Sequence, residues 1–169
     1  MITILNKLQL QITIERLACQ IAENYIDSSK LVLIGIQPRG IFLADKIYDA
    51  LKKVLPVIDL PYGKLDITFY RDDIRSELHQ PNKTDILFSL EDKNVVLIDD
   101  VLFTGRTIRA AMDALLSFGR PNKVELCVLI DRRYSRQLPI QPDYCGKAID
   151  SVFSQKVKVE WEREEVNLY

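Results

Sequence analysis

Histidine and cysteine are scarce in this 169-residue chain, which has one histidine and three cysteines. The cysteines, Cys19, Cys127 and Cys145, are odd in number and far apart, so their spacing fits neither a disulfide framework nor a zinc knuckle. Cys127 lies in the apolar run VELCVLI and is expected to be a small buried residue. The single histidine, His79, lies in a charged segment, where a solvent-exposed residue is a better interpretation than a general base.

A strong net charge and a long apolar run are also absent. The formal net charge is −1, which argues against a protein defined by nucleic-acid binding, although local basic patches remain open. The sequence shows no signal peptide and no apolar run long enough to cross a membrane, so we expect a cytoplasmic protein without membrane association. The length and the lack of repeats predict a single domain over residues 1–169.

The most informative stretch reads VVLIDDVLFTGRT and covers Val95–Thr107. Its apolar start predicts a buried parallel strand, which Asp99 and Asp100 follow before the turn Thr104–Thr107 and an amphipathic run. A turn that opens a helix presents unpaired N–H groups and the positive end of the helix dipole to a phosphate. The adjacent acids suit sugar hydroxyls, or Mg2+ held through its waters. This order predicts a site for a phosphorylated sugar, whereas an ordinary helix N-terminus explains only an isolated acid pair.

A second turn, Gly35–Gly40, follows the apolar run Leu31–Ile36. Its glycines have the spacing of a P-loop, but Ile41 and Phe42 stand where Lys and Ser or Thr are required, so a nucleotide triphosphatase is disfavoured. What remains is a tight turn at a helix start that contains Arg39, which suits an anion. A solvated loop arginine is the alternative.

The remaining pattern predicts helices over 13–28, 40–55 and 105–118, and strands over 64–71 and 123–131. Thr13 is the expected N-cap of the first helix. Parallel strands joined through helices place the polar strand ends at one edge of an α/β sheet. The long charged connection after residue 71 is either disordered or a functional lid.

The stretch VVLIDDVLFTGRTIRAAMDAL resembles the phosphoribosyl pyrophosphate (PRPP) signature of type I phosphoribosyltransferases, and in particular that of the PyrR family of pyrimidine attenuators and uracil phosphoribosyltransferases. Arg39 and Gly40 match the family turn G-I-x-T-R-G, from which Pro38 departs, and Tyr70–Asp73 looks like the YRDD that opens the family's lid. The resemblance implies a type I fold with a largely parallel central sheet flanked by helices, a flexible lid loop at about 72–94 and a small hood at about 132–161. It also implies a homodimer or a larger homo-oligomer.

The reaction that the resemblance implies is pyrimidine salvage, in which uracil and PRPP give UMP and pyrophosphate with Mg2+. Asp99 and Asp100 would bind the ribose hydroxyls and help place the metal, while Arg39 and Arg71 would meet the pyrophosphate; these four are the expected catalytic residues. The expected PRPP contacts are Asp99, Asp100, Val101, Thr104, Gly105, Arg106, Thr107, Arg39 and Gly40. We expect the base near Asp131, Arg132 and Tyr144, because it must lie at the neighbouring strand end.

Two alternatives remain. PyrR-like proteins in some bacteria bind RNA leaders and regulate transcription attenuation, for which the candidates here are Arg16, Arg132, Arg133, Arg136 and Lys147. Glu15 and Cys19 replace the Thr and His of RNA-binding members, and Gln141 replaces an arginine, so phosphate contacts are lost and RNA is disfavoured as a partner. A purine phosphoribosyltransferase would share every PRPP residue and differ only in the base pocket.

Overall fold

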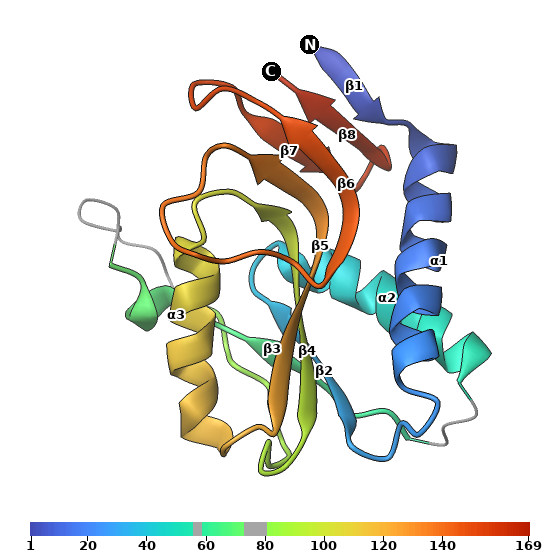
Figure 1. The fold of residues 1–169 in the computed structure, drawn as a ribbon, viewed down its shortest axis with the longest axis vertical. Helices are drawn as coiled ribbons and strands as arrows, with labels where there is room; N and C mark the ends of the chain where they lie inside the picture. Colours follow the sequence, from blue (N-terminus) through green and yellow to red (C-terminus); the bar gives the residue numbers. More distant parts are fainter. Residues whose placement is uncertain (56–58, 73–80) are drawn as a thin grey trace.

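A five-stranded parallel sheet forms the centre of the computed structural model, which describes residues 1–55, 59–72 and 81–169. Its strand order is β3-β2-β4-β5-β6, and every neighbouring pair is parallel (Figure 1). The strands are β2 (Leu31–Ile36), β3 (Tyr62–Leu65), β4 (Asn94–Leu102), β5 (Lys123–Arg133) and β6 (Tyr144–Asp150). The α/β class and the largely parallel sheet predicted from the sequence are confirmed.

Helices cover both faces of this sheet. Helices α1 (Lys7–Asn24) and α2 (Gly40–Val54) pack on one face, and α3 (Arg106–Leu115) packs on the other (Figure 1). Successive residues of β4 alternate between the two cores, with Val96 facing α1 and α2 and Val95 facing α3. Because both faces are buried, these strands are continuous apolar runs in the sequence.

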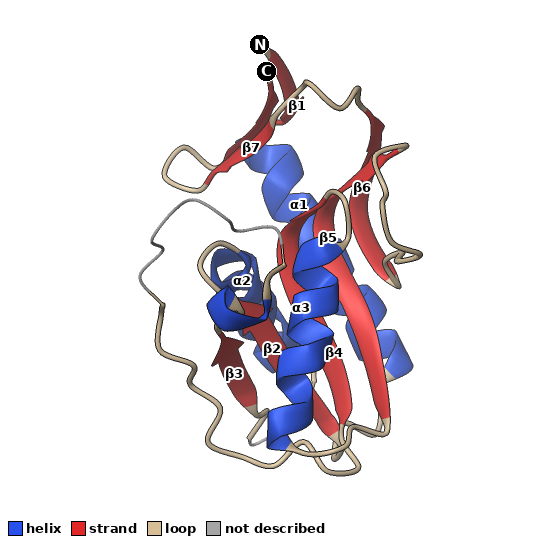
Figure 2. Cartoon of the chain, turned by 90° about the vertical axis from the view of Figure 1, so that its left-hand side faces the viewer, coloured by secondary structure: helices blue, strands red, loops and turns tan. Residues whose placement is uncertain are grey.

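A small antiparallel sheet lies at one end of the molecule and contains both chain termini (Figure 2). Its order is β1-β8-β7, with β1 (Ile2–Leu5), β7 (Val157–Glu160) and β8 (Glu165–Leu168). The sequence predicts a hood over 132–161, but in the structure β6 joins the central sheet, and β1 and β8 come from outside that range. The pairing of the first and last strands is a non-local contact that the alternation of residues 156–161 does not reveal.

Two local predictions are corrected by side-chain capping. Helix α1 begins at Lys7, because Asn6 and Gln9 form a capping box in which Asn6 Oδ1 accepts from Gln9 N at 2.9 Å and Gln9 Oε1 accepts from Asn6 N at 3.0 Å. Thr13 is therefore inside the helix and is not its N-cap. The strand predicted over 64–71 ends at Leu65, because Asp66 Oδ1 accepts from Thr68 N and Oγ1 and turns the chain into a 3-10 segment, η1 (Thr68–Tyr70).

The segment 73–80, with most of the charged part of the expected lid and His79, lies outside the described residues. In the part of the chain that the structure describes, no helix is long and apolar enough to cross a membrane.

Candidate active site

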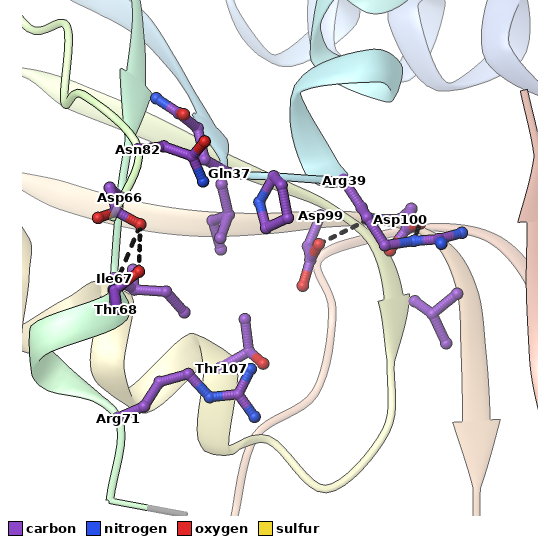
Figure 3. Close-up of a pocket in the computed structure, with 13 residues that line it drawn as sticks. Gln37, Arg39, Asp66, Ile67, Thr68, Arg71, Asn82, Asp99, Asp100 and Thr107 are labelled. Atoms are coloured by element: carbon purple, nitrogen blue, oxygen red, sulfur yellow. Dashed lines mark hydrogen bonds and ion pairs between the residues drawn. The ribbon is translucent and has the colours of Figure 1, made fainter. Parts of the chain in front are cut away.

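Two adjoining cavities, each of about 400 Å³, open at the carboxyl ends of β2, β3 and β4. They share four residues, which are Arg71, Asp99, Val101 and Thr107. The first cavity extends toward the turn after β2, and the second extends along the turn before α3. Figure 3 shows how the first cavity is surrounded by side chains from these separate segments. The turns singled out in the sequence therefore meet around one space.

The acid pair Asp99 and Asp100 lies near the end of β4, and its two members have different surroundings. The Asp99 side chain points into the cavity, whereas Asp100 points toward Arg39 (Figure 3). Burial, together with the neighbouring charge of Asp100, raises the pKa of Asp99 well above its usual range. Asp100 Oδ2 accepts a hydrogen bond from Arg39 Nε at 2.9 Å. Asp99 is thus the carboxyl group that faces a ligand, and Asp100 holds an arginine.

Arg39 connects the acid pair to the small sheet. Besides Asp100, its guanidinium donates from Nη2 to the carbonyl oxygen of Val159 in β7 at 2.9 Å. The preceding Gln37–Pro38 peptide bond is cis. Because Arg39 is half exposed and borders the first cavity, its position at the start of α2 suits an anion in that cavity.

The turn Thr104–Thr107 lines the second cavity and leads into α3. Gly105 has a φ of 93°, in the left-handed region that favours glycine, and it is the N-cap of the helix. The carbonyl oxygen of Thr104 accepts from the N–H groups of Gln137 and Leu138 at 2.9 and 3.2 Å, which fixes the turn from outside the helix. The positive end of the α3 dipole therefore faces the second cavity, as a phosphate site requires.

Arg71 is the residue that follows η1, and its guanidinium extends toward Thr107 (Figure 3). It borders both cavities, so the structure brings together Arg71 and the three groups with which it was predicted to act, Arg39, Asp99 and the Thr104–Thr107 turn.

Four polar residues of the first cavity are not among the residues predicted from the sequence: Gln37, Asp66, Thr68 and Asn82. Asp66 is buried and directly follows β3, so it is a third carboxyl group at the same sheet edge. The sequence signal for Asp66 was its position after alternating apolar residues. Because the strand was predicted to extend over 64–71, Asp66 was placed inside the strand and was not recognised as a residue at its end.

None of the three predicted base contacts lines either cavity. Asp131 accepts a hydrogen bond from the guanidinium of Arg136, whose positive charge offsets the negative charge of the carboxylate. Arg132 is buried, donates to Ser151 Oγ at 2.9 Å and to the carbonyl oxygen of Val152 at 3.1 Å, and lies 3.9 Å from the ring centroid of Phe103. Arg132 thus supports a residue of the second cavity instead of facing it.

Tyr144 is the clearest correction to the predicted site. It is the first residue of β6, so it lies toward the amino ends of the parallel strands, whereas the cavities lie at their carboxyl ends. Its ring is buried in the core under α1, and its hydroxyl group donates to Glu125 Oε2 at 3.0 Å and accepts from Asn24 Nδ2 at 2.9 Å. Tyr144 is therefore a core residue and is not kept as a base contact.

An aromatic pair that sequence reasoning missed forms part of the second cavity. Phe103 and Phe153 both line it, with ring centroids 5.1 Å apart and planes inclined by 41°. Phe153 comes from the connection between β6 and β7, far from Phe103 in the sequence. Arg132 packs against Phe103 from outside the cavity, and the two aromatic side chains that line it suit a planar ring.

Besides Arg132, the four other cations proposed for RNA binding are also used within the chain. Arg133 Nε donates to Asp150 Oδ1 at 2.8 Å, and Arg136 donates to Asp131 and to the carbonyl oxygen of Phe103. Arg16 donates to the carbonyl oxygens of Cys145 and Gly146, and Lys147 Nζ donates to that of Ile4 at 3.0 Å. Acids accompany two of these four charges, which lowers their value for a phosphate backbone.

The residues present fit Mg2+ held together with a substrate. Within residues 1–55, 59–72 and 81–169, no group of three or more His, Cys, Asp or Glu side chains is arranged to hold a metal. Asp99 and Asp100 supply two carboxylates at the cavity. Mg2+ commonly binds through one or two carboxylates, with waters and substrate phosphates completing its shell. The donor set therefore suits a metal shared with a phosphorylated ligand, not an all-protein cage.

The phosphoribosyl transferase domain family matches residues 3–163 of this chain. The fold is similar to that of a hypoxanthine phosphoribosyltransferase from Staphylococcus aureus, with a TM-score of 0.70, 24% identity, and 90% of this chain and 79% of that chain covered. A hypoxanthine phosphoribosyltransferase from Trypanosoma cruzi, solved in complex with the product IMP, gives a TM-score of 0.72 at 17% identity over 97% of this chain and 87% of that chain. The fold and the site thus define a phosphoribosyltransferase domain.

Its family can be given more narrowly. The bifunctional protein PyrR of Picosynechococcus sp. is 50% identical over 159 residues, which are 94% of this chain and 89% of the relative. The bifunctional protein PyrR of Enterococcus faecalis is 44% identical over 160 residues, covering 91% of this chain and 88% of that protein. This chain belongs to the PyrR family, as its sequence motifs predicted.

Proposed function

We propose that this chain transfers the phosphoribosyl group of PRPP to uracil, giving UMP and pyrophosphate. The observation that carries the proposal is the position of Asp99, whose side chain faces a cavity between the start of α3 and the Arg39 turn. A phosphorylated sugar needs donors for its phosphate at one end, acceptors for its hydroxyls in the middle and cations for a leaving group at the other end. The two cavities supply these groups in that order.

The 5′-phosphate is assigned to the turn Thr104–Thr107, where backbone N–H groups, the threonine hydroxyls and the helix dipole all favour an anion. Asp99 accepts from the ribose hydroxyls, and Val101 borders the ring. Arg39 and Arg71 contact the pyrophosphate, and Gly40 lets the α2 turn approach the acid pair. Asp100 acts through Arg39, because its carboxylate is already hydrogen-bonded to that guanidinium.

The chemistry needs no covalent nucleophile from the protein. Displacement at the anomeric carbon develops positive charge on the sugar and negative charge on the departing pyrophosphate. Arg39 and Arg71 stabilise the departing charge, and Asp99 orients the ribose so that the base attacks in line. Mg2+, when bound with PRPP near Asp99 and Asp100, supplies further neutralisation of the phosphate oxygens.

The base is assigned to the second cavity, beside Phe103 and Phe153. Aromatic walls accept any flat ring, so they support a nucleobase without choosing between pyrimidine and purine. The choice of uracil is supported by membership of the PyrR family. The sequence resemblance implies a pyrimidine base for that family, and the pyrimidine assignment rests on this.

The test is product formation from PRPP and Mg2+ with uracil, hypoxanthine, guanine and orotate offered separately. We expect UMP from uracil and no nucleotide from the other three bases. IMP or GMP would replace the uracil assignment with a purine one. No product from any base would favour the regulatory alternative.

RNA-binding regulation of pyrimidine transcription attenuation is the second candidate function. The relatives carry the name bifunctional, which favours it, whereas the internal pairing of Arg133 and Arg136 disfavours it. We expect no tight, salt-sensitive complex between this protein and a pyrimidine leader hairpin. A tight complex that is lost in Arg136→Ala would establish the second function, provided that the variant keeps its transferase activity.

A further inference from the structure

Asp72 lies between two arginines of α3 at the border of the proposed site. Its Oδ2 atom accepts from Arg106 Nη1 at 2.9 Å and from Arg109 Nη1 at 3.3 Å. Arg106 is itself held by Gln137, whose Oε1 accepts from Arg106 Nε at 2.8 Å. The carboxylate of Asp72 is therefore attached to the start of α3, beside the turn that Gln137 and Leu138 hold.

The residue next to Asp72 in the chain is Arg71, which lines both cavities and extends toward Thr107. A second contact on the same segment joins Tyr70 Oη and Ser117 Oγ at 3.4 Å. Residue 71 thus lies between two residues that are each attached to the α3–η2 unit. Because the residues on both sides of Arg71 are held, less backbone entropy is lost when the arginine binds an anion.

We infer that Asp72 is a positioning residue, which acts through Arg106 and Arg109 to hold Arg71 where it meets the phosphoryl groups of the substrate. The inference rests on the proposed function for its kinetic readout. Asp72, Arg106 and Arg109 are all partly exposed, with side-chain exposures of 45%, 33% and 48%, so each ion pair by itself adds little to stability. The effect of replacing Asp72 is therefore expected in substrate binding rather than in folding.

Simple electrostatics predicts the opposite result. Asp72 is an acid near a site for a polyanion, so removing its charge should tighten PRPP binding if the residue acts only through its field. If Asp72 positions Arg71, removing its charge weakens PRPP binding. The sign of the change therefore separates the two explanations.

Arg109 allows the test to be made outside the cavities. It borders neither of them, whereas Arg106 lines the second. Asp113 provides a matched control, because its Oδ2 atom lies 3.5 Å from Nη2 of the same Arg109, one turn further along the helix. Asp113→Asn also removes one negative charge, and it removes an ion-pair partner of the same Arg109. It does not change the segment that carries Arg71.

The experiment measures KM for PRPP, KM for uracil and kcat for the wild type, Asp72→Asn, Asp72→Glu, Arg109→Gln, the double variant Asp72→Asn with Arg109→Gln, and Asp113→Asn. Calorimetric binding of pyrophosphate with Mg2+ accompanies the kinetics and needs no base.

We expect Asp72→Asn to raise KM for PRPP and Kd for pyrophosphate about five- to tenfold, with kcat and KM for uracil nearly unchanged. The double variant should be no worse than Asp72→Asn, since Asp72→Asn already removes the ion pair to Arg109. Asp72→Glu should recover most of the affinity, and Asp113→Asn should behave as the wild type.

Three results would overturn the inference. The first is unchanged or tighter pyrophosphate binding in Asp72→Asn, and the second is an equal loss in Asp113→Asn. The third is a fall in kcat with lower thermal stability and constant KM, which would indicate a merely structural residue. If the wild type makes no nucleotide, the proposed function fails, and the pyrophosphate titrations still decide the role of Asp72.

Discussion

Gly40 lies directly against Asp99. A Cβ atom built on Gly40 would lie 3.0 Å from Asp99 Oδ1 and 2.7 Å from the carbonyl oxygen of Ile98. The nearer neighbour is backbone of a central strand and cannot move aside as a flexible side chain would. The absence of a side chain at residue 40 therefore sets how closely the first turn of α2 approaches the acid pair.

Gly40→Ala tests this approach. The added methyl group forces β4 and α2 apart, so we expect a loss of about 1–3 kcal/mol in the free energy of unfolding. We also expect a fall in kcat/KM for PRPP, because Asp99 moves with the strand. Chemical denaturation and steady-state kinetics measure the two effects, and Phe42→Ala in the same turn is the control. Wild-type stability and turnover in Gly40→Ala would show that the close approach has no consequence.

Arg39→Ala removes the hydrogen bonds to Asp100 and Val159 and the proposed contact with pyrophosphate. A charge-assisted hydrogen bond contributes about 1.5–3 kcal/mol, so we expect KM for PRPP to rise roughly ten- to a hundredfold. KM for uracil should change little. Arg39→Lys should recover only part of the loss, because an ammonium group lacks the planar fork of donors. Kinetics identical to those of the exposed control Arg163→Ala would refute the assignment of Arg39.

Asp99→Asn and Asp100→Asn should have different effects. Burial raises the pKa of Asp99, so its ionisation opposes folding as the pH rises above the usual carboxyl range. Without substrate or Mg2+, Asp99→Asn should therefore melt at the same temperature as the wild type or higher at pH 7. Its kcat should nevertheless fall by about a hundredfold or more, as expected for a group that orients the reacting sugar. Asp100→Asn should instead weaken PRPP binding through Arg39. Full activity in Asp99→Asn would remove the ribose-binding role.

Glu125 offers a test of stability far from the cavities. Burial alone would raise its pKa, but hydrogen bonds from Lys123, Tyr25 and Tyr144 outweigh burial and lower it. A carboxyl group with a lowered pKa in the folded state stabilises the protein above its unfolded-state pKa, and this contribution is lost as the pH falls through the folded value. Thermal melting should therefore show Glu125→Gln less stable than the wild type at pH 7, with the difference shrinking below about pH 4. The exposed control Glu162→Gln should melt like the wild type at both pH values. A difference that is constant with pH would mean that the hydrogen bonds, not the charge, are responsible.

The parts of the site that the sequence predicts are those built from consecutive residues. Asp99 and Asp100 lie near the end of one strand, the Thr104–Thr107 turn follows that strand, and Arg39 follows another, so strand, turn and helix patterns suffice to bring them to one sheet edge. Phe153 could not be found this way, because it meets Phe103 only when the connection after β6 folds back over the sheet. Tyr144 was misplaced because the residues around it were assigned to the hood, whereas Tyr144 begins β6 of the central sheet. Thr13 and Asp66 show that capping by Asn6 and a side-chain turn at Thr68 override a regular apolar pattern.

The hydrogen bond from Arg39 to Val159 has a consequence for distant parts of the chain. Val159 lies in β7, which pairs with β8, and β8 pairs in turn with β1. Residues 2–5 and 165–168 are therefore mechanically coupled to the guanidinium that is proposed to receive the leaving group. A peptide fused to either terminus, or a substitution in those outer strands, would perturb turnover through the anchoring of one arginine.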